Sequence, residues 1–206
     1  WVDDPGTGGG TAASSMTAGS SMSVALPGVG SRGMRTGLPS RSSSRRAAKR
    51  DGTVLGLKIR LIADIGAYNM LLTAAIPTLT MMMANATYNI QAIRTTLTEV
   101  FTNKTPTDAY RGAGRPEATY FVERAMDMLA RELKMDPADV RRKNFISKDK
   151  FPFATQMGAV YDSGDYEKAL DRALKNSGWK DLQAQRDKMR AEGRLVGLGL
   201  SMYVEV

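Results

Sequence analysis

Hydrophobic and polar residues alternate along residues 53–68 and again along residues 91–101. This pattern predicts two β-strands. Gly66 interrupts the first alternation, which indicates a bulge or a close approach of another backbone. The segment between the two strands, residues 69–86, is apolar and contains Pro77, and we expect a loop there.

Beyond residue 115, apolar residues recur at helical spacing. The pattern predicts four helices, at residues 116–134, 136–144, 165–176 and 179–192. Asp136 and Pro137 suit the N-cap and first turn of the second helix, and Ser163 or Asp165 suits the N-cap of the third. A final alternation predicts a strand at residues 193–206. Strands followed by helices and a strand are typical of an α+β or α/β fold, and we expect α+β.

Residues 5–50 differ from the rest of the chain because they are rich in Gly, Ser, Thr and Arg and show no hydrophobic period. They contain seven Lys or Arg and no Asp or Glu, which accounts for nearly all of the net charge of +8. They suit a disordered linker, a nucleic-acid-binding tail, or a segment translated out of frame. The lack of acidic residues favours the third, and the lack of interleaved aromatic residues argues against nucleic acid.

We therefore expect residues 1–46 to be a low-complexity basic segment, disordered or out of frame, and residues 47–206 to be the folded part. The chain begins at Trp1 and stops at Val206 inside a predicted strand, so we expect it to be a piece of a longer protein. It contains no run of 18 apolar residues, and a transmembrane helix is not expected.

The chain has neither cysteine nor histidine. Disulfides, thiolate-held zinc or iron–sulfur clusters, histidine-ligated metals and Ser-His-Asp catalysis are therefore excluded for these residues. If the protein is a redox enzyme, its electron carriers lie on other chains or on a cofactor held through oxygen, nitrogen and backbone contacts.

The segment whose residues best suit the binding of a ligand reads Asp-Ala-Tyr-Arg-Gly-Ala-Gly-Arg at residues 108–115, between a predicted strand and a predicted helix. Gly112 and Gly114 allow positive φ and close approach of the backbone to a ligand. The helix start offers N–H groups to an anion, and Arg111 and Arg115 offer guanidinium donors. Both an oxyanion-binding loop and a plain tight turn with solvated arginines fit this pattern. Neither a dinucleotide fingerprint nor a phosphate-binding P-loop is present.

Residues 109–115 resemble the active-site loop of the aerobic carbon monoxide dehydrogenase large-subunit family, in its form II variant. This family belongs with the xanthine dehydrogenase and aldehyde oxidase molybdenum hydroxylases. Five further segments agree with it, at residues 64–68, 102–107, 115–118, 141–146 and 161–164. The resemblance implies that residues 47–206 are part of the molybdenum-cofactor-binding domain of a large subunit, whereas residues 5–46 do not fit it.

The resemblance also implies an oxidoreductase that hydroxylates a small carbon substrate with oxygen derived from water. Its cofactor would be molybdenum–molybdopterin cytosine dinucleotide, bound by Ala109, Tyr110, Arg111 and Gly112. Ala113 and Gly114 would lie in the substrate pocket. Partner subunits would carry an iron–sulfur cluster and FAD in a cytoplasmic hetero-oligomer that can lie at the inner face of the membrane. The catalytic base glutamate and a glycine-rich pterin loop would lie outside this chain, so the piece alone would be inactive.

Two positions depart from relatives with known substrates. Gly112 stands where the carbon-monoxide-oxidising variant carries a cysteine, and copper(I) needs such a soft thiolate ligand. Ala113 stands where the xanthine-oxidising relatives place an aromatic residue, so a planar purine would lose stacking energy. Another small substrate is therefore favoured, with carbon monoxide oxidation as the alternative.

The other polar and sulfur-containing side chains are interpreted as structural. Glu117 and Glu123 suit the helix dipole and a solvated helix face, and residues 141–143 suit a solvated helix end. The three methionines at residues 81–83 are expected to pack under a loop.

Overall fold

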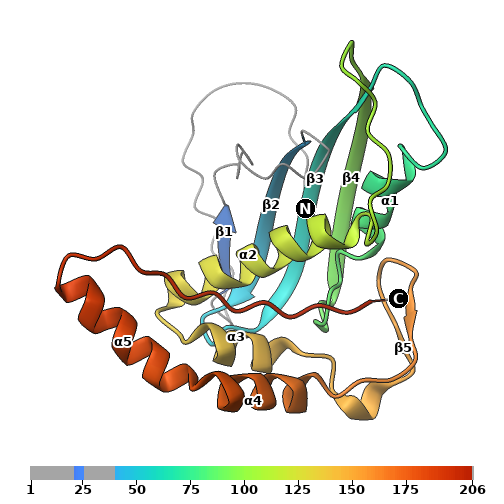
Figure 1. Cartoon of the computed structure of the whole chain (residues 1–206). Helices are drawn as coiled ribbons and strands as arrows, with labels where there is room; N and C mark the ends of the chain where they lie inside the picture. The colour runs from blue at the N-terminus through green and yellow to red at the C-terminus, as the bar shows by residue number, and fades with distance from the viewer. Residues whose placement is uncertain (1–20, 26–39, 206) are drawn as a thin grey trace, which may run out of the picture.

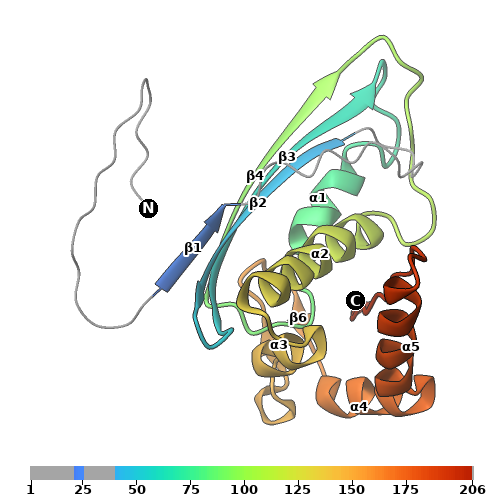
Figure 2. The ribbon, with the colours of Figure 1, turned by 90° about the vertical axis from the view of Figure 1, so that its left-hand side faces the viewer.

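A four-stranded sheet forms one layer of the computed structural model, which describes residues 21–25 and 40–205. Its strands follow the order β1 (Ser21–Ala25), β2 (Ser40–Lys49), β3 (Val54–Gly66) and β4 (Ala92–Phe101). The pairs β1–β2 and β2–β3 are antiparallel, whereas β3 and β4 are parallel. The described helices all lie on one side of this sheet (Figure 2).

The helical layer begins with α1 (Ala75–Met82) and α2 (Arg115–Leu133), which lie nearest the sheet, followed by α3 (Pro137–Asn144). Farther out lie α4 (Tyr166–Ser177) and α5 (Trp179–Ala191), reached through a 3-10 turn (Lys148–Lys150) and a small hairpin of β5 (Phe153–Ala154) and β6 (Val160–Tyr161) (Figure 1). The predicted α+β class and the four predicted helices are confirmed. In the described part of the chain, no helix has both the length and the apolar character needed to cross a membrane.

The core lies between β3 and α2. Every second residue of β3 from Leu57 to Ile65 is buried, as expected for a strand with one covered face. The buried residues of α2 recur at helical spacing from Ala118 to Ala130 and pack against that face. The N-caps also follow the sequence, because the Asp136 side chain accepts a hydrogen bond from Ala138 N at 2.7 Å.

The loop predicted at residues 69–86 is wrong in its second half, because residues 75–82 form α1. Pro77 does not prevent this helix, because a proline in the first helical turn removes no intrahelical hydrogen bond. The turn that leads into the helix is closed at Leu72, whose carbonyl accepts hydrogen bonds from Ala75 N and Ile76 N. Burial of Ile76 and Pro77 then holds it against its neighbours.

The closing strand predicted at residues 193–206 is also wrong over the residues described, because no strand forms between residues 193 and 205. This stretch, called here the C-terminal segment, runs past α2 and reaches no strand edge (Figure 2). Side chains bind its backbone instead. Arg141 Nη2 donates to Leu200 O at 2.8 Å, and Met202 N donates to the Glu123 carboxylate at 2.8 Å.

Strand β2 lies partly in the segment predicted to be low-complexity, since residues 40–46 are its first part. Its sequence shows no alternation, but its backbone pairs with β3, for example Ser44 opposite Ile59. Pairing with an apolar neighbour therefore defines this strand more than its own pattern does. Most of residues 1–39 lie outside the described residues, and the division of the chain at residue 46 stays a prediction.

Candidate functional site

The loop of residues 102–114 connects β4 to α2 (Figure 1). Because β3 and β4 are parallel, their carboxyl ends meet at one edge of the sheet, where loops commonly carry function. Ala67 N donates to Lys104 O at 3.0 Å, which holds the two outgoing chains together. Gly66 has φ +81°, and a Cβ added there would lie 2.5 Å from Pro106 Cα. The close backbone approach predicted at Gly66 is therefore confirmed.

Asp108 fixes the middle of this loop. Its Oδ1 accepts hydrogen bonds from Ala109 N at 2.8 Å and from Leu72 N at 3.1 Å. The carboxylate thus ties the loop to the segment that leads into α1. It also occupies the main-chain N–H of Ala109, so that this predicted cofactor residue keeps no free amide donor.

A tight turn follows, closed by hydrogen bonds from Ala113 N to Tyr110 O at 2.9 Å and from Arg115 N to Gly112 O at 3.1 Å. Gly112 has φ +103°, a conformation that favours glycine. The main-chain N–H groups of Tyr110, Arg111 and Gly112 donate to none of the described residues. Consecutive main-chain N–H groups of this kind are available to bind anionic or oxo oxygens.

The side chains of the turn face outward. Tyr110 is 89% exposed and Arg111 is also exposed, whereas Ala109, Gly112 and Ala113 are half-buried. The four predicted cofactor residues are therefore consecutive and at least partly accessible. The turn sits on the surface, so it presents one side of a site to whatever covers it.

Gly114 lies apart from this exposed turn. It is buried at the junction of α2 with α1, and an added Cβ would lie 2.6 Å from Ile76 O and 2.7 Å from Thr80 N. Close packing of two helices thus accounts for this glycine without a substrate. Its predicted place in the substrate pocket stays a prediction.

Substitution of Gly114 by alanine is expected to lower the free energy of unfolding by about 2 kcal/mol. The new Cβ meets backbone atoms of α1, which cannot move aside as a flexible side chain would. Chemical denaturation measures the change. Gly193→Ala is the matched control, because Gly193 has φ +81° against +84° at Gly114 but no atom within 4 Å of its added Cβ. Equal losses in both variants would mean that only backbone strain, and no packing contact, requires Gly114.

Arg115, the second arginine of the motif, points to the C-terminal segment. Its Nε lies 2.9 Å from Glu205 Oε1. Since Glu205 is largely exposed, the pair contributes little to stability. It nevertheless brings the C-terminal segment beside the start of α2, close to the turn.

A buried polar cluster behind the loop was missed by the sequence analysis. Arg141 of α3 is fully buried, and its Nε donates to Glu123 Oε2 at 2.8 Å. The Tyr88 hydroxyl donates to the other oxygen of Glu123, and Arg141 Nη2 donates to Asp127 at 2.9 Å. The predicted solvated positions of Glu123 and Arg141 are therefore wrong. Helical spacing places both on a polar face, and nothing in the sequence shows that another segment covers that face.

The groups of this cluster shift one another's ionisation. Burial raises the pKa of Glu123, while Arg141, Tyr88 and the Met202 amide act in the opposite direction. Desolvation is the largest effect on Arg141 and acts to lower its pKa, but the charges of Glu123, Tyr88 and Asp127 and the hydrogen bond to Glu123 together raise the pKa. Burial and the charge of Glu123 raise the pKa of Tyr88. Tyr88 and Arg141 therefore keep their protons and remain donors.

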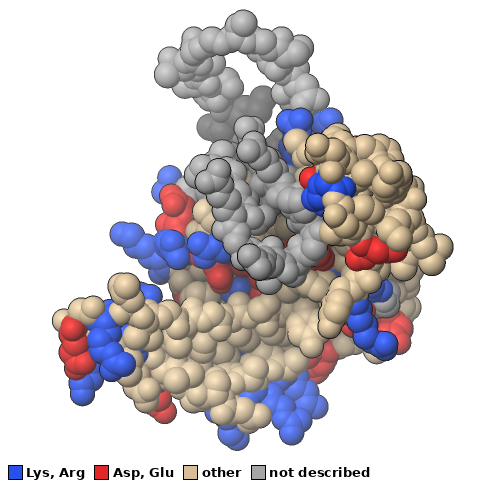
Figure 3. Space-filling model, turned by 45° about the horizontal axis from the view of Figure 1, so that its top comes forward, with Lys and Arg blue, Asp and Glu red and all other residues tan. Residues whose placement is uncertain are grey.

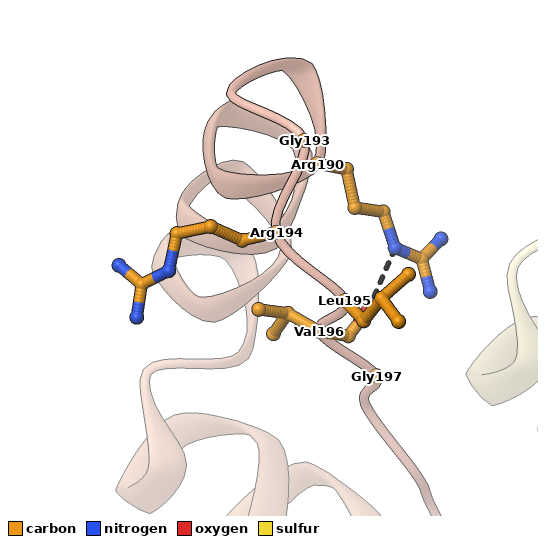
Figure 4. A pocket seen from close by; sticks show the side chains of 6 residues that line it. All are labelled: Arg190, Gly193, Arg194, Leu195, Val196 and Gly197. Atoms are coloured by element: carbon orange, nitrogen blue, oxygen red, sulfur yellow. Dashed lines mark hydrogen bonds between the residues drawn. The ribbon is translucent and has the colours of Figure 1, made fainter.

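A hollow of about 620 Å³ lies at the turn after α5, lined by Arg190, Arg194 and Val196 among others. Arg190 Nε donates to Val196 O at 2.7 Å, and the guanidiniums of Arg190 and Arg194 point away from each other (Figure 4). Two diverging cations cannot clamp one anion, so this hollow is a weaker candidate than the turn at residues 110–112.

Direct metal ligation has no support in the described part of the chain, where no three acidic side chains are grouped to hold an ion. The donors at residues 110–112 are N–H groups, which bind oxygens and not metals. They fit the oxygen atoms of a phosphate or of an oxo-metal cofactor that brings its own ligands.

A protein-family model described as the molybdopterin cofactor-binding domain matches residues 33–145. The carbon monoxide dehydrogenase large chain of Hydrogenophaga pseudoflava is 39% identical over 166 residues, which cover 78% of this chain and 21% of that protein. The subunit gamma of the 6-hydroxypseudooxynicotine dehydrogenase complex of Paenarthrobacter nicotinovorans is 31% identical over 160 residues, covering 75% of this chain and 20% of that protein.

Among solved structures, quinoline 2-oxidoreductase from Pseudomonas putida 86 superposes with a TM-score of 0.76 at 29% sequence identity. The match covers 80% of this chain and 21% of that chain. The chain thus spans about a fifth of the length of these relatives. The relatives are oxidoreductases, and none of these matches points to nucleic-acid binding by the basic N-terminal segment.

Proposed function

The chain belongs to the large-subunit family of molybdenum hydroxylases, in its molybdopterin cofactor-binding domain, and we propose that it forms part of a catalytic subunit that hydroxylates a small carbon substrate with water-derived oxygen. Family membership rests on the matched domain and on the similarity to the carbon monoxide dehydrogenase large chain. The reaction itself is proposed, because most of the relatives' length has no counterpart in this chain.

The observation that carries the proposal is the row of main-chain N–H groups at Tyr110, Arg111 and Gly112 that donate to none of the described residues, together with the exposed side chain of Arg111. A molybdenum–molybdopterin cytosine dinucleotide cofactor supplies the redox chemistry when bound. The chain's own residues orient it by donating hydrogen bonds to its oxygens. Ala109 serves as a positioning residue, since its amide is bonded to Asp108.

The substrate pocket begins at Ala113, which is half-buried next to the turn. Its methyl group leaves room that an aromatic residue would fill, and it offers no face for stacking. We therefore expect a small substrate. Gly114 contributes by allowing α2 to pack against α1, which fixes the turn.

Carbon monoxide oxidation is the second candidate, favoured by the similarity to a carbon monoxide dehydrogenase large chain. It is disfavoured by Gly112, because copper(I) binds soft thiolate ligands and this chain contains no cysteine. Stoichiometric copper in a purified, active holoenzyme would reverse this preference.

Electron transfer away from the centre requires carriers that this chain does not provide, because it has no cysteine or histidine to hold them. We propose an iron–sulfur subunit and an FAD-binding subunit as partners, in a hetero-oligomer located in the cytoplasm. Separate purification of the chain is then expected to give no oxidoreductase activity.

The test is a chimera in which residues 47–206 of this chain replace the matching segment of the Hydrogenophaga pseudoflava large chain. Gly112→Val in this chimera is expected to reduce bound molybdenum and molybdopterin at least tenfold. Valine cannot readily adopt φ +103°, so the turn that aligns the free N–H groups is lost. Metal analysis and the fluorescence of released pterin measure the cofactor content.

Gly158→Val is the control for this chimera, because Gly158 has φ +90° and no atom within 4 Å of an added Cβ. It imposes similar backbone strain far along the chain from the turn. Full cofactor content in the Gly112→Val chimera would show that the turn does not bind the cofactor.

A further inference from the structure

The C-terminal segment lies against α2 in an extended conformation, although it forms no strand. Its even-numbered residues from Val196 to Val204 are half-buried, and the residues between them are exposed. This alternation is that of a strand with one covered face. Figure 1 shows the segment running back along α2 toward the start of that helix. Side chains of α2 and α3 take the place of a neighbouring strand.

A buried ion pair binds the backbone of this segment. Met202 N donates to Glu123 Oε2 at 2.8 Å, and Arg141 Nη2 donates to Leu200 O at 2.8 Å. In an extended chain the main-chain groups of residues i and i+2 point to the same side. The carboxylate and the guanidinium therefore offer one acceptor and one donor at the spacing that a strand edge would offer.

The Glu123 carboxylate is itself held in place by two side chains. Its Oε1 accepts a hydrogen bond from the Tyr88 hydroxyl, and its Oε2 accepts one from Arg141 Nε at 2.8 Å. Glu123 is 4% exposed, so water does not reach it to replace Met202 N as a donor. Hydrogen bonds to a charged group of this kind are about twice as strong as neutral ones. The carboxylate is thus a fixed anchor for the C-terminal segment.

Beyond Met202, the segment reaches the turn at residues 110–112 through Glu205. Arg115 Nε lies 2.9 Å from Glu205 Oε1, and Arg115 N closes the turn by donating to Gly112 O at 3.1 Å. The exposed ion pair has little strength of its own. On the face shown in Figure 3, acidic and basic side chains lie in small mixed groups, so charge alone does not select one partner for an exposed arginine. The position of Glu205 therefore depends on the anchor at Met202.

We propose that Glu123 is a positioning residue for this turn. It anchors the C-terminal segment through Met202 N, so that Glu205 holds Arg115 where its main chain closes the turn. The inference rests on the proposed function, in which the N–H groups of the turn bind oxygens of the cofactor. Such groups orient a ligand only when the turn is held in one conformation. Glu123 supplies this restraint through the segment, because it is buried and lies apart from the turn itself.

Met202→Pro in the full chain tests the anchor, because proline has no N–H and the side chains of the buried cluster stay in place. Hydrogen–deuterium exchange is measured at Ala113 N and Arg115 N, the two donors that close the turn. Both should exchange at least about tenfold faster, because the turn opens more often once Glu205 is released. Exchange at the fully buried Leu129 of α2 should be unchanged, which shows that the helix stays folded.

Tyr203→Pro is the matched control, because it makes the same substitution at the next residue. The N–H of Tyr203 points to the other side of the segment and donates to none of the described residues. Exchange in the turn should keep its original rate in this variant. Equal acceleration by the two prolines would overturn the proposal, since it would then be a general effect of distorting the segment. Unchanged exchange in Met202→Pro would overturn it as well.

Glu205→Gln provides a second variant that leaves the anchor intact, because Glu205 is largely exposed. It should speed exchange at Ala113 and Arg115 as Met202→Pro does, but exchange at Met202 N should stay slow. Unchanged exchange in the turn of this variant contradicts the link through Glu205, even where the proline variant unfolds.

Cofactor content separates the positioning role from the proposed function. It is measured in the chimera with the Hydrogenophaga pseudoflava large chain, which now carries Met202→Pro. Bound molybdopterin should fall about tenfold, the range found when a group that orients a cofactor ligand is removed. Full molybdopterin content together with faster exchange in the turn would support the positioning role and contradict the proposed function.

Discussion

Arg141→Met is expected to lower the free energy of unfolding by about 4 kcal/mol, the range found when one partner of a buried ion pair is removed. Arg141 donates to Glu123, to Asp127 and to the carbonyl of Leu200. Methionine fills the space of the aliphatic stem but leaves these acceptors without their donor. Glu123 then remains a buried carboxylate with the Tyr88 hydroxyl and Met202 N as its donors. Urea or guanidinium denaturation measures the loss.

Arg142→Met is the control, because it makes the same substitution at the next residue. Arg142 pairs with Glu167 at 3.2 Å and with Asp171 at 2.6 Å, but both carboxylates are mostly exposed. Surface pairs of this kind contribute about 1 kcal/mol or less each. Similar losses in the two variants would contradict the distinction between a buried cluster and a surface pair.

A second measurement follows from the C-terminal segment, which the cluster binds at Leu200 and Met202. Arg141→Met should increase the rate of limited proteolysis in residues 194–205 more than Arg142→Met does. Replacing Glu123 by Leu in the Arg141→Met background should restore part of the stability, because the unpaired buried carboxylate is then removed.

The elements that the sequence predicted correctly are those whose side chains decide their conformation. Helix α2 shows an apolar stripe from Ala118 to Ala130, and Asp136 caps α3 with its own carboxylate. The errors concern partners that a local pattern does not contain. Residues 193–205 alternate as a strand does, but no strand edge among the described residues reaches them. Strand β2 has no alternation and forms through pairing with β3.

In the candidate site, too, features set by the local sequence were predicted and features set by distant segments were not. Gly112 was recognised as a turn residue from its motif, and the structure gives it φ +103°. The burial of Arg141 and Glu123 could not be predicted, because it depends on Tyr88 and Met202, which lie 35 and 79 residues from Glu123. Similarly, the contact that requires Gly114 comes from α1, which lies where the sequence predicted a loop containing Pro77.

Arg46→Met is expected to raise the free energy of unfolding by about 3 kcal/mol. Arg46 lies in β2 and is 2% exposed, and its guanidinium nitrogens donate to no residue that the structure describes. Burial lowers the pKa of Arg46 to about 10, with the charge of Asp127 acting in the opposite direction. A fall of this size corresponds to about 3 kcal/mol of unfavourable burial of the charged form.

The loss of stability caused by burying the charged Arg46 guanidinium is present at every pH below about 10. The reason is that folding lowers the pKa of Arg46, so the unfolded chain holds the proton more tightly. Stability measured near pH 7 therefore shows the full difference between the two proteins. Lys49→Met is the control, since Lys49 lies in the same strand but is exposed, and it should change stability little. The buried position of residue 46 therefore favours an apolar side chain over an arginine. A less stable Arg46→Met protein would instead mean that the guanidinium has an anionic partner.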